Sequence, residues 1–240
     1  MQQLKIHPIP ICRITADKGG FLFLQMNEYG KKITFPVYVW LIEGGDEPIL
    51  VDTACTAEEF WKYTLYAKDL EDIEPIEEAL PRHGVSLSDI KTIIITHLDA
   101  DHILNMRKFP NARFIVQEEE MNFALNPHPF FAKKYTPHLY EGINWETVNG
   151  DKEIIPGVEV IFTPGHTAGS QSVAVDTAQG KMVIPGLCSV DENYDSDVVS
   201  IPDMHFDPFK AYASVVKIRE IADRVLPTHS QSLEGTVTIP

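Results

Sequence analysis

The segment THLDADH at residues 96–102 carries the strongest signal in this chain. It directly follows the apolar run at residues 93–95, which lacks alternation and is therefore typical of a strand buried on both faces. Polar groups at the carboxyl end of such a strand lie in a crevice of an α/β fold. Imidazole and carboxylate groups suit zinc, iron or manganese, and alternate residues of an extended turn can converge on one ion. His97, Asp99 and Asp101 are therefore candidate metal ligands, and His102 can face a neighbouring ion.

A solvated loop is the other interpretation of this segment, with Asp101 capping a helix that runs through Met106. Two further histidines count against it. His166 lies in TPGHTAGS, residues 163–170, and His229 lies in LPTHS, residues 226–230; each follows an apolar stretch. Three strand ends that carry histidine are improbable as accidents, so the three segments together predict a metal site.

Apolar periodicity and turn residues predict an order of strands, helices, strands and a last helix. The expected strands cover residues 21–26, 33–42, 48–52, 90–96, 112–117, 158–163, 171–176, 181–185 and 224–226. The expected helices cover residues 56–69, 72–83, 118–125 and 208–223. This order predicts two sheets covered by helices, an α/β arrangement. We expect one continuous domain over residues 1–240, with an aromatic-rich, irregular insertion at about 120–147.

Composition narrows the class of protein. The 240 residues are 44% hydrophobic and 23% charged, which is ordinary for a soluble globular protein. No apolar run reaches the roughly 20 residues that span a bilayer, and the N-terminus does not resemble a signal peptide, so we expect a cytoplasmic protein with no membrane partner. A formal charge of −15 disfavours nucleic acid as a partner. The three cysteines are few and odd in number, which argues against a disulfide scaffold.

The ordered motifs resemble those of the metallo-β-lactamase superfamily. Its pattern is an early Asp after a strand, Thr-His-x-His-x-Asp-His, a Gly-His, a bridging Asp and a late His. This chain offers LVDT at 50–53, THLDADH at 96–102, PGHTAG at 164–169 and LPTH at 226–229, in the same order. Within the superfamily, residues 105–117 are similar to the acyl-homoserine lactonase group. The resemblance implies an αββα metallo-β-lactamase sandwich.

The resemblance also implies two metals and their ligands. His97 and His166 would hold the first metal. The second metal would be held by Asp101, His102 and His229. Asp52 would orient one of the ligands, as metal sites commonly require.

Two positions depart from the family pattern. Asp99 stands where the pattern has a histidine; its harder, charged carboxylate favours iron or manganese over zinc, or weakens the first site. The bridging aspartate is absent. Cys188 or Asp191 would replace it, and a cysteine ligates the second zinc in this region of true β-lactamases.

The implied function is hydrolysis of a lactone, ester or related acyl bond by hydroxide formed at a metal ion. Asp101 would move the proton and Tyr194 would donate to the oxyanion. We expect one or two divalent ions, zinc first, with iron or manganese as options. The substrate would be a small molecule, its acyl chain received by the insertion; a homodimer is left open. The alternatives are an iron-dependent oxidoreductase or dioxygenase on the same fold, and a small-molecule-binding protein with a degenerate site.

Overall fold

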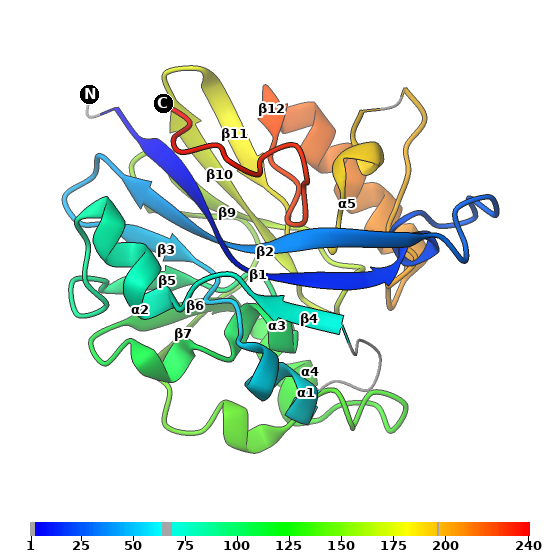
Figure 1. The fold of residues 1–240 in the computed structure, drawn as a ribbon, viewed down its shortest axis with the longest axis horizontal. Helices are drawn as coiled ribbons and strands as arrows, with labels where there is room; N and C mark the ends of the chain where they lie inside the picture. Colours follow the sequence, from blue (N-terminus) through cyan, green and yellow to red (C-terminus); the bar gives the residue numbers. More distant parts are fainter. Residues whose placement is uncertain (1–2, 64–68, 196) are drawn as a thin grey trace.

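The computed structural model describes residues 3–63, 69–195 and 197–240, which form two β-sheets packed face to face between helices (Figure 1). The strands of the larger sheet follow the order β4 (Asp69–Asp72), β1 (Lys5–Asp17), β2 (Lys32–Glu43), β3 (Ile49–Val51), β5 (Thr92–Ile94), β6 (Arg113–Gln117) and β7 (Trp145–Val148). Those of the smaller sheet follow the order β12 (Arg224–Val225), β11 (Gly180–Ile184), β10 (Gln171–Thr177), β9 (Val158–Phe162) and β8 (Lys152–Ile155).

Helices cover the outer face of each sheet. The α-helices are α1 (Ala57–Tyr63), α2 (Ile76–Ala79), α3 (Ala100–Ile103), α4 (Glu118–Leu125) and α5 (Pro208–Ile221). Short 3-10 turns are η1 (Lys18–Phe21), η2 (Leu80–His83), η3 (Met106–Lys108), η4 (Pro137–Leu139) and η5 (Asp191–Asn193). Apolar residues of α1 to α4 share one core cluster with the larger sheet, and those of α5 share another with the smaller sheet. None of the helices in the described residues is long and apolar enough to cross a membrane.

Strand β2 shows why the sheets lie between helices. Val37, Val39 and Leu41 belong to the core cluster under α1 to α4. Tyr38 and Trp40 belong to the cluster between the two sheets. Side chains of a strand alternate between its faces, so a strand that is apolar at every position must be covered on both sides. The helix–sheet–sheet–helix order confirms the α/β sandwich that the sequence predicts.

The carboxyl ends of several strands meet at one edge of the sandwich. β3, β5 and β6 run parallel, as do β11 and β12, and a hairpin loop joins β9 to β10. Gln171 ties the two sheets together at this edge: its backbone N–H donates to the Thr96 carbonyl at 2.9 Å and its side chain donates to the Ile95 carbonyl at 2.8 Å. Segments far apart in sequence therefore present their first loop residues to a common space.

The first strand differs from the expectation. Residues 21–26 form no strand; η1 and turns occupy this region, and the strand that pairs with β2 is β1, which the sequence analysis did not include. Pro8 and Pro10 make β1 hard to recognise in the sequence, because proline has no N–H to donate to a neighbouring strand and is confined to strand edges and bulges. β4 pairs only with Cys12 to Thr15, so both prolines lie where β1 has an open edge, and a register shift follows Pro10.

Three further boundaries differ. The expected helix 56–69 is α1, and its residues 64–68 lie outside the described part of the chain. The expected helix 72–83 begins only after Pro75, and continues as α2 and η2 to Gly84 with φ +77°. Residues 69–72, expected within or beside helices, form β4. The expected irregular insertion contains β7, which pairs in parallel with β6 and so extends the larger sheet.

Candidate metal centre

Six side chains at the shared edge form two groups of potential metal ligands. The first group consists of His97, Asp99 and His166, and the second of Asp101, His102 and His229. Within each group the potential ligand atoms all lie within 4.8 Å of one another. The structure therefore brings together histidines from three segments that lie far apart in the sequence.

Short turns of the backbone position these side chains. Asp99 has extended backbone angles and α3 begins at the next residue, so Asp101 joins the second group instead of converging with His97. Asp101 lies inside α3 and does not cap it, which removes the solvated-loop interpretation. His166 follows Gly165, whose φ of +130° and close approach to the Ala211 backbone exclude a side chain.

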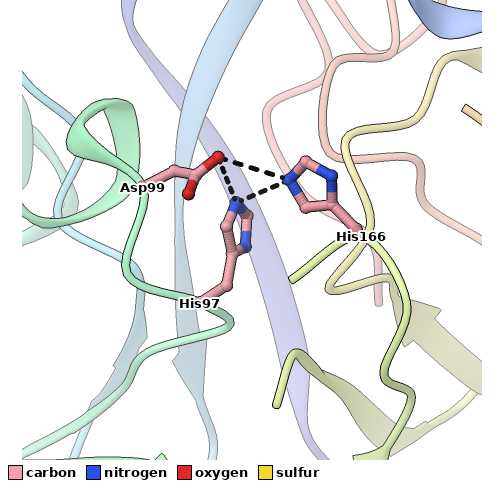
Figure 2. A group of neighbouring side chains, drawn as sticks. All are labelled: His97, Asp99 and His166. Carbon is pink, nitrogen blue, oxygen red and sulfur yellow. Dashed lines mark hydrogen bonds and ion pairs between the residues drawn. The ribbon is translucent and has the colours of Figure 1, made fainter. Parts of the chain in front are cut away.

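In the first group, one carboxylate oxygen faces two imidazoles (Figure 2). Asp99 Oδ2 lies 3.7 Å from His97 Nε2 and 3.4 Å from His166 Nε2. The two Nε2 atoms lie 3.3 Å apart. His166 Nδ1 donates to the Met204 carbonyl, so its Nε2 carries a lone pair that points at the group.

His97 has the same tautomer. The Thr96 hydroxyl donates to Asp52 at 2.8 Å, so it accepts from His97 Nδ1 at 3.0 Å. The Nε2 lone pairs of His97 and His166 therefore face each other beside a carboxylate. This donor set fits a cation, which would be attracted by all three atoms.

The second group is built in the same way. His102 Nδ1 donates to Asp52 at 2.7 Å and His229 Nδ1 donates to the Pro36 carbonyl at 3.2 Å. Both Nε2 atoms are buried without a hydrogen-bond partner. Asp101 Oδ2 lies 3.4 Å from the first of them and 3.9 Å from the second. Buried, orphaned ring nitrogens beside a carboxylate fit a metal ion, because such nitrogens are otherwise paired.

Asp52 connects the two groups. Its carboxylate is fully buried and accepts from the Thr96 backbone and hydroxyl, at 2.7 and 2.8 Å, and from His102 Nδ1. Its φ of +59° is uncommon for a residue with a side chain. Such strain at a site is maintained where the surrounding contacts require it. Asp52 therefore sets the orientation of His102 directly and that of His97 through Thr96.

Burial and neighbouring charges shift the pKa values of the site in opposite directions. Burial lowers the pKa of His97 well below its ordinary value and that of His229 to about 4. Burial also opposes protonation of His102, but Asp101 and Asp52 together raise its pKa well above the ordinary value. Burial acts to raise the pKa of Asp101, and the charge of His102 lowers it overall. These directions keep Asp101 ionised and His97 and His229 neutral, which are the forms that bind metal.

Glu120 is a site residue that the sequence analysis did not identify. It is fully buried, and its two oxygens accept from the Leu98 N–H at 3.0 Å and the Gly169 N–H at 2.8 Å. These two amides belong to the loops that carry His97 and His166. The only sequence signal is three consecutive glutamates at 118–120, of which one turns inward from α4. Glu120 thus holds the two loops of the first group together.

The expected aromatic insertion lies beside the first group. Phe131 stacks on Phe206, with ring centroids 3.8 Å apart, and both contact Phe123 edge-on or tilted. Lys134 reaches from this cluster to Asp99, where its Nζ lies 2.7 Å from Oδ1. The sequence analysis did not single out Lys134. The insertion therefore contributes a charge to the metal centre as well as apolar surface.

Neither group includes Cys188 or Asp191. Cys188 packs in the core cluster of the larger sheet, where burial raises the pKa of its thiol, with smaller contributions from Asp101 and Asp99. Asp191 instead accepts from the hydroxyls of Ser230 and Ser232, at 2.6 and 3.0 Å. It therefore anchors the loop that follows His229. A bridging ligand at either position stays a prediction.

Tyr194 packs mainly on the outer face of the smaller sheet. Its side chain packs against the core cluster beneath α5, which includes Ile161 and Val215. Its hydroxyl is buried, and burial raises the pKa of Tyr194. These contacts are with the outer face of the smaller sheet, and a role in the oxyanion site stays a prediction.

Comparisons with known proteins point to one family. The sequence profile described as the metallo-beta-lactamase superfamily matches residues 33–186. The N-acyl homoserine lactonase AiiA of Bacillus thuringiensis subsp. kurstaki is 31% identical over 209 residues, which is 82% of this chain and 81% of that protein. The N-acyl homoserine lactonase AttM of Agrobacterium fabrum is 27% identical over 205 residues, with 80% of this chain and 76% of that protein covered.

Solved structures of lactonases share the fold of this chain. A variant of B. thuringiensis AiiA with N-decanoyl-L-homoserine bound at its active site superposes with a TM-score of 0.78 and 28% identity, over 98% of this chain and 97% of that one. An N-acyl homoserine lactone hydrolase with N-hexanoyl-L-homoserine bound at its catalytic metal center gives the same TM-score, identity and coverage. The shared fold includes the sandwich that carries both groups of ligands.

Proposed function

This chain belongs to the metallo-β-lactamase superfamily and is a metal-dependent hydrolase, and we propose that it opens the ring of N-acyl homoserine lactones. The observation that carries the proposal is the pair of ligand groups, in which four Nε2 atoms and two carboxylates face inward. The lactonase relatives support the lactone as substrate. A redox activity on the same fold and a degenerate binding protein, the two alternatives from the sequence, are not favoured by these relatives.

The cofactor is a divalent metal, and we propose zinc. Imidazole nitrogens outnumber carboxylates in both groups, and such mixed sets are common zinc sites. A bound divalent ion would supply Lewis acidity to the lactone carbonyl and an activated water. His97, Asp99 and His166 would hold one ion, and Asp101, His102 and His229 a second.

Asp101 is the proton carrier in this proposal. Its side chain is partly open, with 17% of its surface exposed, while His102 lowers its pKa. The ionised carboxylate of Asp101 would therefore accept a proton from the attacking water and return it to the ring oxygen that leaves. Donation by the Tyr194 hydroxyl to the oxyanion is kept as a prediction from the sequence.

The acyl chain of the substrate would contact the aromatic cluster of Phe123, Phe131 and Phe206. These rings lie within reach of the first group, since Lys134 contacts both Asp99 and the face of Phe206. A flexible apolar chain gains free energy by leaving water for such a surface. The proposal therefore predicts a preference for long acyl chains over short ones.

A direct assay tests the proposal. Zinc-loaded protein is incubated with N-decanoyl- and N-hexanoyl-L-homoserine lactone, and ring opening is followed by mass spectrometry as the gain of one water. The expected result is turnover of both, faster with the decanoyl chain. Turnover of p-nitrophenyl esters but of neither lactone would reject the lactone assignment. His128→Ala, which alters an exposed histidine of the insertion, is the control for substitutions of the ligand histidines.

A further inference from the structure

Lys134 is the only lysine or arginine paired with a ligand of either group among the residues that the structure describes. Its Nζ lies 2.7 Å from Asp99 Oδ1, while Asp99 Oδ2 faces the two imidazoles of the first group. The two oxygens of one carboxylate thus have different partners. The lysine comes from the insertion, 35 positions after Asp99 in the chain.

Aromatic rings hold the ammonium in place. Lys134 Nζ lies 5.2 Å from the centre of the Phe206 ring and 5.9 Å from that of Tyr135. Both distances lie in the range of cation–π attraction. The Phe131 ring stacks on Phe206 and so fixes that ring in turn. The lysine is therefore positioned by its surroundings, with 29% of its side chain exposed.

The second group has no such cation. In the described part of the chain, the only basic side chains beside its carboxylate, Asp101, are the imidazoles of His102 and His229. A further carboxylate, Asp52, lies behind His102 and receives its Nδ1 proton. The second group therefore has two negative charges within its immediate contacts, whereas the negative charge of the first group is balanced by Lys134.

We infer that Lys134 makes the two metal sites unequal, so that a divalent ion binds the Asp101–His102–His229 group tightly and the His97–Asp99–His166 group weakly. An ion in the first group would share its only carboxylate with an ammonium, which draws electron density from Asp99 and so weakens it as a ligand. In the described part of the chain, no lysine or arginine pairs with the carboxylate of the second group. The inference rests on the proposed function only in taking both groups as metal sites.

The pair also accounts for the departure at position 99. The resembled family pattern has a neutral histidine where this chain has Asp99. Together the Asp99 carboxylate and the Lys134 ammonium have no net charge, so the pair restores the charge of the imidazole. It does not restore the ligand strength, because one carboxylate now serves two cations. Lys134 is thus a positioning residue that acts on the metal through Asp99.

A metal titration without substrate tests the inference. Metal-free protein competes with a chromophoric chelator for zinc, and the two binding constants are fitted. Wild type is expected to bind one equivalent tightly and a second at least about tenfold more weakly. Lys134→Met is expected to tighten the second equivalent by about tenfold and to leave the first unchanged. Lys133→Met removes the same charge from an exposed neighbour and is expected to change neither constant.

Two results would overturn the inference. One is equal affinity for both equivalents in wild type. The other is a second equivalent that Lys134→Met leaves unchanged or weakens while circular dichroism shows the folded protein. Lys134→Gln, which keeps a hydrogen-bond donor but not the charge, serves in place of the methionine variant if that variant does not fold.

A double-mutant cycle assigns the effect to Asp99. In an Asp99→His background, Lys134→Met is expected to change the second constant by less than about threefold, because the shared carboxylate is gone. An undiminished tenfold effect there would show that Lys134 acts through another group and overturn the assignment. The titration uses no lactone, so absence of lactone hydrolysis would reject the proposed function while leaving this result intact.

Discussion

The two ligand groups consist of the same residue types, two histidines and one aspartate each, but their surroundings differ. The second group rests on a buried carboxylate, Asp52, and its aspartate has no cationic partner other than histidine. The first group rests on a hydroxyl and a backbone carbonyl, and Lys134 pairs with its aspartate. Two groups with the same ligands can therefore differ in metal affinity, because the charges of the residues that contact those ligands differ.

The largest expected effects come from removing one histidine from each group, which tests the ranking of the two metal sites. His229→Ala is expected to remove the tightly bound metal and to reduce kcat/KM for lactone hydrolysis by about 1000-fold or more. His97→Ala is expected to retain about one tightly bound equivalent and a measurable remainder of activity. Metal content after desalting, with kcat/KM, checks both. Equal metal loss in the two variants would contradict the ranking of the sites.

The acid sensitivity of the metal-free protein tests the burial of His229. Burial lowers the pKa of this side chain from 6.5 to about 4, so the unfolded chain binds its proton more readily than the folded chain. The free energy of unfolding must therefore fall as pH is lowered from about 6.5 to about 4, by about 3 kcal/mol from this group. Urea denaturation at several pH values measures it. His229→Gln is expected to reduce that pH dependence and His128→Gln to keep it.

Substitution of Asp52 tests the second group, because this carboxylate accepts a hydrogen bond directly from His102. Asp52→Asn keeps the size of the side chain, and asparagine tolerates the positive φ. It loses the charge that accepts from His102 Nδ1. We expect zinc affinity of the second group to fall by roughly 10- to 100-fold. If the chelator titration showed a change only in the weaker equivalent, Asp52 would support the first group, and the assignment to the second group would be wrong.

Glu120→Gln makes the matching change behind the first group. The glutamine amide can accept only one of the two backbone N–H bonds, from Leu98 and Gly169, which leaves one amide without an acceptor. We expect the free energy of unfolding to fall by about 1–3 kcal/mol and the weaker zinc equivalent to weaken further. Urea denaturation and the same titration measure these changes. Glu119→Gln, on an exposed position of α4, is the control.

Local sequence patterns predicted much of the candidate site because three of the ligand histidines come within a few residues of a strand end. His97 follows β5 of the larger sheet, whereas His166 and His229 follow β9 and β12 of the smaller sheet, and the packing of the two sheets brings these ends to one edge of the sandwich. The patterns failed where local preference and tertiary pairing disagree. β1 contains two prolines and is stabilised by its pairing with β2, which no local window of sequence reveals.

By itself, the sequence determined the α/β class, the order of the motifs and the chemical type of the ligands, because these depend on periodicity and on residues close together in the chain. Only the tertiary structure decided that Glu120 joins two loops and that Lys134 pairs with Asp99. Those contacts join residues that lie on different elements. Electrostatic attraction depends on distance in space, and the fold alone sets that distance.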